Sequence, residues 1–172
     1  MKQKKCKECK TLFTPERPLQ SVCGFECSLS HSRKKAQTKV KVEIRQAKEK
    51  LKSRSEWLKE AQAAFNAWIR YRDEGLPCIS CNGLTGKRNA GHYRSVGAAP
   101  ELRFEEKNCH IQCEKCNSYL SGNLIAYRKN LLVKIGIDSL EWLEGKHEAK
   151  HYSIEQIKEI KQLYKQKLKE TK

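Results

Sequence analysis

The sequence predicts an α+β fold: a small zinc-stabilised core of strands wrapped by helices, preceded by an N-terminal zinc-binding module and a basic helical arm. Three observations lead to this prediction. Eight of the nine cysteines form two sets of four at spacings that suit zinc. Apolar residues recur at helical spacing on both sides of the second set. Between the two pairs of that set, several glycines favour turns and a hairpin.

The composition points to small domains and a polyanionic partner. The chain has 172 residues, 38% hydrophobic and 33% charged, which is too little apolar material for one large core, and bound zinc can supply the missing folding free energy. The formal net charge is +16, and residues 1–54 alone hold 16 Lys and Arg against 5 Asp and Glu. A segment this basic predicts a nucleic-acid partner. The alternative is a solvated basic helix that only keeps the protein in solution, but two zinc modules beside it favour nucleic acid.

The N-terminus reads MKQKKCKECK and has no apolar leader segment, and no stretch of the sequence is long and apolar enough to cross a membrane. We therefore expect a cytoplasmic protein with no membrane partner. Thiols stay reduced in that compartment, so the paired cysteines are expected to bind metal instead of forming disulfides. The ninth cysteine, Cys109, is expected to pack as a small apolar side chain beside the second zinc site.

Residues 1–32 are predicted to form the N-terminal zinc-binding module. Its first cysteine pair precedes a short strand, and its second pair opens a helix. A unit this small buries little surface, so bound zinc would provide most of its folding free energy. The ligands would be Cys6, Cys9, Cys23 and Cys27.

Residues 33–54 are predicted to form the basic helical arm, because they are polar, rich in Lys and Arg, and nearly free of turn-forming residues. Apolar residues recur at helical spacing along one narrow face: Val40, Ile44, Ala47 and Leu51. This face could pair with a second copy of the chain in a homodimer, pack on residues 55–72, or follow DNA. Three basic residues at the start of the arm are candidate DNA contacts: Arg33, Lys34 and Lys35.

Residues 55–172 are predicted to form the largest segment, which carries the second zinc set. Ser53 and Glu56 fit a capping box that opens a helix with a broad apolar face, and Gly75 ends that helix. Further helices are predicted beyond the zinc-bearing part. One is closed by Gly136, a short one follows it, and the last begins after a second capping box at Ser153.

The second zinc set consists of two CxxC pairs, which is a strong signal: Cys78, Cys81, Cys113 and Cys116. Zinc held by four thiolates has no open position for a substrate, so this site is expected to be structural. Any chemistry must therefore come from side chains that the zinc-bound segment presents. The candidates are His92, Asn108, His110 and Asn117.

The motif GHYRS around His92 and the motif KNCHIQCEKCN resemble the HNH endonucleases, which share the ββα-metal fold. Three spacings agree with the family pattern: Asn108 lies sixteen residues after His92, and Cys113 and Asn117 lie five and nine residues after Asn108. The longer segments NAGHYRSVGAAPELRF and QCEKCNSYLSGNL, with the zinc-bearing basic N-terminus, resemble the NinG (Rap) family of lambdoid phage recombination endonucleases. This resemblance covers most of the chain and is strongest over residues 57–127.

The resemblance implies a role for each residue of the motif. His92 would be the general base that activates water, Asn108 would orient the loop of the histidine through hydrogen bonds, and Asn117 would bind a catalytic Mg²⁺ or Mn²⁺. One position departs from the family pattern. Many HNH enzymes carry an acidic or histidine ligand just before the base, and here Gly91 stands there. Substitute ligands could be Asn89, His110 or a glutamate such as Glu105, and a cation held mainly by phosphate and Asn117 would bind only with DNA present.

The function that the resemblance implies is cleavage of branched DNA, such as Holliday junctions or D-loops. The setting would be phage recombination in the bacterial host cytoplasm, beside other phage recombination proteins. Four basic residues around the site would contact the DNA backbone without reading bases: Arg94, Arg103, Lys107 and Lys115. Two alternatives remain open. One is a DNA-binding recombination protein without catalysis, in which His92 and Asn117 only support the zinc module, and the other is an HNH nuclease that cuts linear duplex.

Overall fold

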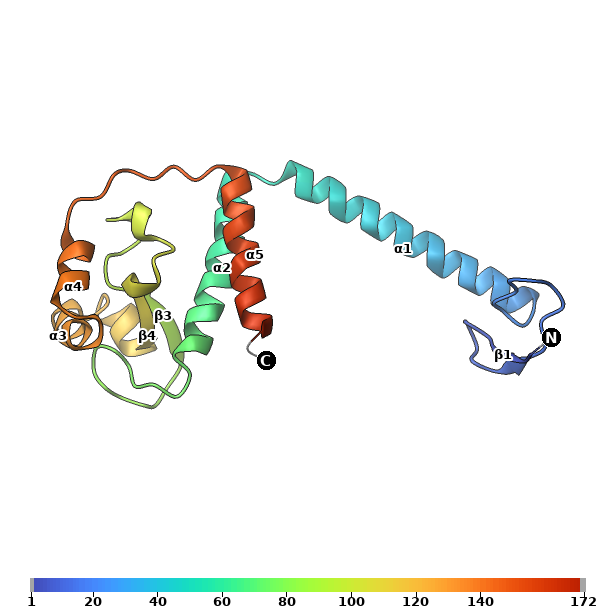
Figure 1. Ribbon diagram of the computed structural model, residues 1–172, viewed down its shortest axis with the longest axis horizontal. Helices are drawn as coiled ribbons and strands as arrows, with labels where there is room; N and C mark the ends of the chain where they lie inside the picture. Colours follow the sequence, from blue (N-terminus) through green and yellow to red (C-terminus); the bar gives the residue numbers. More distant parts are fainter. Residues whose placement is uncertain (1, 171–172) are drawn as a thin grey trace. The chain divides into compact units, whose positions relative to one another are not determined.

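The structure, a computed structural model, describes residues 2–170 and divides into two compact units, Met1–Lys52 and Ser53–Lys172 (Figure 1). Each unit combines helices with a two-stranded antiparallel sheet, so the predicted α+β class is confirmed. The boundary predicted between residues 32 and 33 falls inside a helix. The N-terminal zinc-binding segment and the basic arm therefore belong to one unit.

The first unit is built around its cysteines. Strand β1 (Lys4–Lys5) pairs with β2 (Leu12–Phe13), and the first cysteine pair lies in the turn between them. Helix α1 (Phe25–Leu51) begins between the two cysteines of the second pair, after Gly24. Cys6 is completely buried, whereas no residue of α1 is buried. The packing of this unit is therefore concentrated at the cysteine cluster and not along the helix.

Helix α1 starts at Phe25, as predicted for the second cysteine pair, and continues without a break through the predicted arm. Its 27 residues contain neither glycine nor proline, so nothing in the sequence interrupts it. The apolar face predicted along this helix lies on the surface of the unit, with Val40 51% and Ile44 50% exposed. The helix ends where Lys52 adopts an extended conformation.

The second unit opens with helix α2 (Arg54–Arg72), which begins at the predicted capping box. The backbone N–H of Glu56 donates to the Ser53 hydroxyl, and the Glu56 carboxylate accepts from the backbone N–H of Ser53 at 2.8 Å. Helix α2 lies beside the C-terminal helix α5 (Ile154–Glu170) (Figure 1). Apolar side chains of both helices form two clusters of the core, with buried members Trp57, Ala61, Phe65, Ile69, Ile157 and Tyr164.

A hairpin of strands β3 (Arg88–His92) and β4 (Cys109–Cys113) packs against α2. Opposed residues of an antiparallel pair share a face of the sheet, and the two faces alternate along each strand. His92 lies opposite Cys109, and Gly91 lies opposite His110. The hairpin therefore presents His92 and Gly91 to different surroundings.

The two faces of the hairpin have different neighbours. On one face, Cys109 belongs to the apolar cluster of Phe65, whose ring centroid lies 5.8 Å from that of His92. On the other face, the hydroxyl of Tyr127 donates to the carbonyl of Gly91 at 3.0 Å. Tyr127 belongs to helix α3 (Leu124–Ile135), so the hairpin is held between α2 and α3.

Helix α2 also completes the outer edge of β4. The backbone N–H of Ile111 donates to the buried carboxylate of Asp73 at 3.0 Å, and Arg72 donates to the carbonyl of Cys109 at 2.8 Å. The carbonyl of Ile111 accepts from Ile79 at 3.0 Å. These contacts satisfy backbone groups that a two-stranded sheet would otherwise leave unpaired.

The remaining elements connect the hairpin to its helices. Two short 3₁₀ turns, η1 (Pro100–Leu102) and η2 (Glu106–Asn108), lie in the loop before β4, and one π-helical turn, η3 (Lys115–Tyr119), follows it. Gly136, at φ +78°, separates α3 from α4 (Ile137–Glu144). Among residues 2–170, no helix has both the length and the apolar composition needed to cross a bilayer.

Candidate functional site

Both predicted cysteine sets come together in space. Within each set, the four cysteine sulfurs all lie within 4.8 Å of one another. The sulfurs of Cys81 and Cys113 are 3.8 Å apart, and those of Cys9 and Cys23 are 3.5 Å apart. Four sulfurs about 2.3 Å from one tetrahedral zinc lie roughly 3.8 Å from each other. Each cluster is therefore compatible with one structural zinc ion.

Metal binds the thiolate, and in each cluster the surroundings favour that form at one buried cysteine. Burial raises the pKa of Cys78, but backbone N–H groups, first among them that of Cys113, outweigh burial and lower this pKa to about 7. Burial likewise raises the pKa of Cys6, and backbone N–H groups of Cys9, Cys23 and Glu8 lower it to about 6. The neighbouring Cys23 raises the pKa of Cys27 to about 12, and burial raises that of Cys116 to about 12. The second cluster ties the turn after α2 to the end of β4 and to η3.

His92 ends β3 and is held by a backbone carbonyl. Its Nε2 lies 3.0 Å from the carbonyl oxygen of Arg103. A carbonyl can only accept, so Nε2 carries the ring proton and Nδ1 carries the lone pair. Burial is the largest influence on this histidine and lowers its pKa below the usual 6.5. The imidazole is therefore neutral at pH 7, the state in which it can accept a proton.

Cys109 is the cysteine outside both clusters, and it lies beside His92. Its sulfur is 3.6 Å from Nδ1 of His92 and is completely buried. Burial raises the pKa of the thiol, so the thiol stays protonated. A thiol is only a weak hydrogen-bond donor, so this neighbour leaves Nδ1 basic.

Asn108 fixes the loop that joins β3 to β4. Its amide oxygen accepts from the backbone N–H of Arg94 at 2.8 Å, and its amide nitrogen donates to the carbonyls of Arg94 and Leu102 at 3.0 and 3.2 Å. Leu102 directly precedes Arg103, whose carbonyl holds His92. The buried amide of Asn108 thus positions the carbonyl that sets the tautomer of the histidine.

His110 lies on the face of the hairpin opposite to that of His92, and Asn117 lies in η3, after the hairpin. His110 is buried, its Nδ1 lies 3.3 Å from the Tyr127 hydroxyl, and burial together with the charges of Lys134 and Arg72 lowers its pKa to about 3. Asn117 is half-buried in η3. Its Oδ1 lies 2.9 Å from the point where a Cβ on Gly91 would stand.

The sequence offered Asn89, His110 and Glu105 as further ligands for a divalent cation. Asn89 lies opposite Gln112 in the hairpin, whereas the Glu105 carboxylate caps η2 by accepting from the N–H of Lys107 at 3.1 Å. In the described part of the chain, the only groups of His, Cys, Asp or Glu side chains that could hold a metal are the two cysteine clusters. A divalent cation near Asn117 would therefore depend on amide oxygens.

Gln112 is a residue of this site that the motif did not single out. Its amide oxygen is buried and has no hydrogen-bond partner among the described residues, and it lies 1.9 Å from the same point above Gly91. Asn117 and Gln112 thus direct amide oxygens to one place, and oxygen donors are what Mg²⁺ and Mn²⁺ prefer. The signal in the sequence was strand alternation, which puts position 112 on the face of position 91.

The four basic residues predicted around the site have different environments. Arg94 donates to the carbonyls of Leu143 and Glu144 at 3.0 and 3.2 Å, at the C-terminal end of α4. Arg103 lies within 3.4 Å of the Gln62 amide oxygen, and Lys107 donates to Ser139 at 3.1 Å. Lys115 is exposed on η3. Lys115 and Lys107 are therefore the more accessible cations of this group.

In the first unit, the predicted DNA contacts lie on exposed positions of α1. Lys34 forms an ion pair with Glu8, which binds the helix to the segment of the first cysteine pair. Arg33 and Lys35 are exposed beside it. This end of α1 therefore carries two cations that point to solvent and one that serves the fold.

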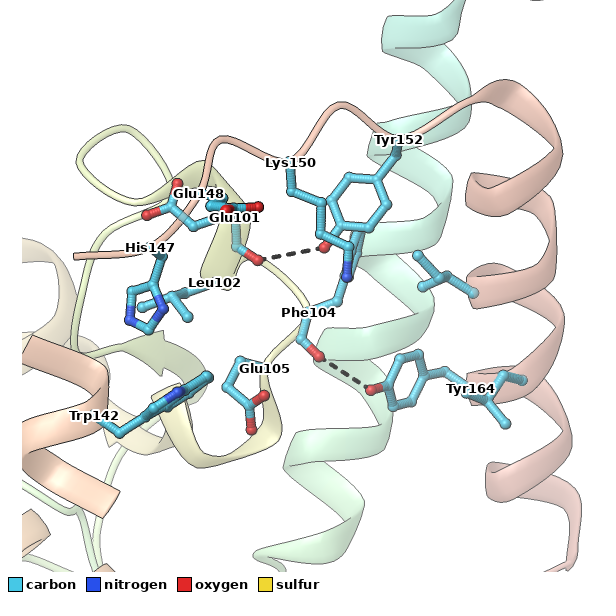
Figure 2. A pocket seen from close by; sticks show the side chains of 12 residues that line it. Glu101, Leu102, Phe104, Glu105, Trp142, His147, Glu148, Lys150, Tyr152 and Tyr164 are labelled. Carbon is cyan, nitrogen blue, oxygen red and sulfur yellow. Dashed lines mark hydrogen bonds between the residues drawn. The ribbon is translucent and has the colours of Figure 1, made fainter. Parts of the chain in front are cut away.

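A cavity of about 420 Å³ lies in the second unit, between α5 and the loop before β4 (Figure 2). Figure 2 shows that the hydroxyls of Tyr152 and Tyr164 donate to backbone carbonyls of that loop, at 3.4 and 3.3 Å. The charged residues that line the cavity are Glu101, Glu105, Glu148 and Lys150, and His147 lies beside them. Three carboxylates and one ammonium make it a poor site for a phosphate, and of the predicted site residues it holds only the alternative ligand Glu105.

Over residues 1–172 the chain matches the sequence model of a family described as "Bacteriophage Lambda NinG protein". It is 42% identical over 189 residues to "Protein ninG" of Escherichia phage 933W, across 98% of this chain and 93% of that protein. It is also 42% identical over 191 residues to "Protein ninG" of Escherichia phage lambda and of Salmonella phage P22, with the same coverage. No solved structure matches the chain.

Proposed function

The chain belongs to the NinG family of bacteriophage proteins, and on this premise we propose that it is a metal-dependent DNA endonuclease of the HNH type. Its substrates would be branched recombination intermediates such as Holliday junctions and D-loops, as the resemblance of the motifs implies. The two zinc ions would be structural, and Mg²⁺ or Mn²⁺ would be the catalytic cation. Other phage recombination proteins would be partners in the same process.

One observation carries the proposal: a neutral histidine with a fixed tautomer at the end of β3. Nε2 donates a hydrogen bond to the Arg103 carbonyl at 3.0 Å, so Nδ1 is the basic nitrogen, and burial keeps the pKa of the ring below 6.5. Burial and a hydrogen-bond partner also constrain His110, so what distinguishes His92 is its place in the motif, sixteen residues before Asn108. The hydrogen bonds of Asn108, which hold the loop of that carbonyl, support the same reading.

In the proposed reaction, a water oxygen attacks a phosphorus of the DNA backbone, and the bond from phosphorus to the 3′-oxygen breaks. Nδ1 of His92 accepts the proton that the water loses, and the leaving 3′-oxygen takes up a proton from solvent. When bound, the divalent cation would stabilise negative charge on the phosphate and the leaving oxygen. Asn117 would help hold that cation, and Lys107 and Lys115 would bind flanking phosphates.

The test is Mg²⁺-dependent cleavage of a synthetic four-way junction by wild type and by His92→Ala. We expect the variant to lose about 10²–10⁴-fold in rate, the usual contribution of proton transfer, while DNA affinity and zinc content barely change. His147→Ala is the matched control, because it removes a histidine that lines the separate cavity of Figure 2. Cleavage by His92→Ala at the wild-type rate would overturn the proposal.

The pH profile tests the same assignment. The base must be unprotonated, so the rate should rise as pH passes upward through the pKa of His92. Burial lowers that pKa, so the midpoint of the rise should lie below pH 6.5. A rate that keeps rising well above pH 7 would identify a different base.

Substrate choice is tested by comparing the junction with a linear duplex of identical sequence. Faster cleavage of the junction is expected, since basic residues that bind backbone and not bases would leave the shape of the DNA to decide the substrate. Equal rates would favour a nuclease of linear duplex. Binding without Mg²⁺-dependent cleavage of either substrate would favour a zinc-containing DNA-binding protein without catalysis.

A further inference from the structure

We propose that Gln112 is a ligand of the divalent cation, in the place of the side chain that Gly91 lacks. The inference deepens the proposed function, because it assumes that a divalent cation binds at Asn117. It is carried by the orientation, the burial and the position of one amide group on β4.

The orientation of the Gln112 amide is determined by its neighbours. Its nitrogen donates to the carbonyl of Gly122 at 2.7 Å and to the Ser80 hydroxyl at 2.6 Å. A carbonyl only accepts, so the nitrogen must face Gly122 and the oxygen must face the other way. The amide therefore cannot be reversed without losing a buried hydrogen bond.

In this orientation, the Oε1 atom of Gln112 lowers the stability of the fold unless a partner binds it. Gln112 is completely buried, and its Oε1 has no hydrogen-bond partner in the described part of the chain. Leaving a buried acceptor unsatisfied costs about 1–3 kcal/mol. A cation is one partner that would remove this cost, since amide oxygens are ligands for hard divalent ions.

The position of that oxygen explains why residue 91 is a glycine. A Cβ on Gly91 would stand 1.9 Å from Oε1 of Gln112 and 2.9 Å from Oδ1 of Asn117. No real Cβ tolerates the first distance. The Gln112 side chain thus fills the space into which a side chain at position 91 would point, next to the residue proposed to hold the cation.

The rival explanation is that Gln112 only positions Asn117. If the Asn117 amide were reversed, its nitrogen could donate to the Gln112 oxygen, and no cation would be needed. The two explanations differ in one respect. A positioning residue acts only through Asn117, whereas a second ligand still contributes when Asn117 is removed.

The first experiment is therefore a double-mutant cycle read by Mn²⁺ binding. The zinc-loaded full chain is titrated with Mn²⁺ in the presence of junction DNA, and free Mn²⁺ is followed by its electron paramagnetic resonance signal. Gln112→Leu should weaken Mn²⁺ binding at least about tenfold. This is the smallest loss of affinity usually seen when a residue that supports a metal ligand is removed. The same substitution should weaken binding further in an Asn117→Ala background. No further loss in that background would overturn the ligand role.

Ser80→Ala is the matched control for perturbing the fold. It removes a partner of the Gln112 nitrogen without touching the oxygen, so the Mn²⁺ affinity should stay within about twofold of wild type. A loss as large as that of Gln112→Leu would overturn the proposal, because packing and not the oxygen would then explain both results.

The second experiment transfers the ligand to the other strand. Gln112→Ala vacates the space above Gly91, and Gly91→Asp in that background places a carboxylate there. The double variant should bind Mn²⁺ more tightly than wild type even without DNA, since a carboxylate is a stronger ligand than an amide. Failure of the double variant to gain Mn²⁺ affinity, with its zinc content intact, would overturn the proposal. Both experiments measure Mn²⁺ binding and not cleavage. The ligand role of Gln112 can therefore fail while His92 remains the general base, and it can hold even if His92 is not the base.

Discussion

The two units of this protein carry the same kind of cysteine cluster, but they differ in what else holds them. In the first unit, α1 has no buried residue, and the buried residues among 2–52 are the metal ligand Cys6 and Pro15. In the second unit, three apolar clusters surround the hairpin and its helices. The same motif thus contributes nearly the whole fold in one unit and a local clamp in the other.

The difference teaches how to interpret a cysteine set. The number and spacing of the cysteines predict a metal, but only the surrounding apolar residues tell how much of the fold depends on it. The same contrast applies to charge. The first unit exposes its cations along a helix, whereas the second uses Arg72 and Arg94 to bind buried or capping carbonyls.

The largest expected effect, and the strongest test of the contrast between the two units, is the loss of zinc. Structural zinc contributes about 10–16 kcal/mol in small modules. Treatment with a chelator should therefore abolish hydrogen-exchange protection of the β1–β2 hairpin, while amides of α2 and α5 remain protected. Cys109→Ser, which removes the cysteine outside both clusters, should retain two zinc ions by metal analysis. Equal loss of protection in both units would show that the apolar clusters do not support the second unit alone.

A second effect tests the polar support of the hairpin. Asp73→Ala removes the acceptor of the Ile111 N–H and leaves Arg72 without its buried partner, so the second unit should lose about 3–5 kcal/mol of unfolding free energy. All three tryptophans lie in this unit, so their fluorescence during urea unfolding measures it alone. Zinc at the first cluster should be unaffected. Asp73→Asn, which keeps an acceptor for Ile111, should cost less, and equal losses would contradict this account.

A third effect concerns charge on α1. Replacing its two solvent-facing predicted DNA contacts by glutamine, at Arg33 and Lys35, should flatten the slope of log K against log salt by about 2. The matched control replaces two exposed lysines of the second unit, at Lys129 and Lys165. If the control flattens the slope as much, the first unit has no special role in DNA binding.

The smallest effect sharpens the boundary between the units. Ser53→Ala removes the hydroxyl that caps α2, which should cost the second unit about 1 kcal/mol. Tryptophan fluorescence again measures the loss. The unfolding of the first unit, followed by hydrogen exchange of β1 and β2, should not change, because the cap lies wholly within the second unit. A change there would show that the two units do not unfold independently.

Much of the fold was predictable because its signals are local. The capping boxes at Ser53 and Ser153 mark the starts of two helices, and Gly136 marks the end of a third. The helix predicted to open at the second cysteine pair is confirmed, because α1 starts at Phe25. Its unbroken continuation into the basic arm was not predicted, since the zinc-binding module and the arm were treated as separate segments.

The candidate site was predictable only in part. The spacing of His92, Asn108 and Asn117 follows a known motif, and strand register then places them. The partners of those residues are long-range contacts: the Arg103 carbonyl for His92, and Arg72 and Asp73 at the edge of β4. Gln112 was missed because glutamine in a strand is usually a solvated side chain, and only burial reveals its oxygen.

The tight fit between Gly91 and Gln112 constrains the order in which this site could change over generations of phage. A larger residue at position 91 collides with Gln112 first, so position 112 must shrink before position 91 can grow. The two positions should therefore vary together among relatives. A relative with a carboxylate at the position of Gly91 should have a small residue at the position of Gln112, and an intermediate carrying both long side chains should be rare.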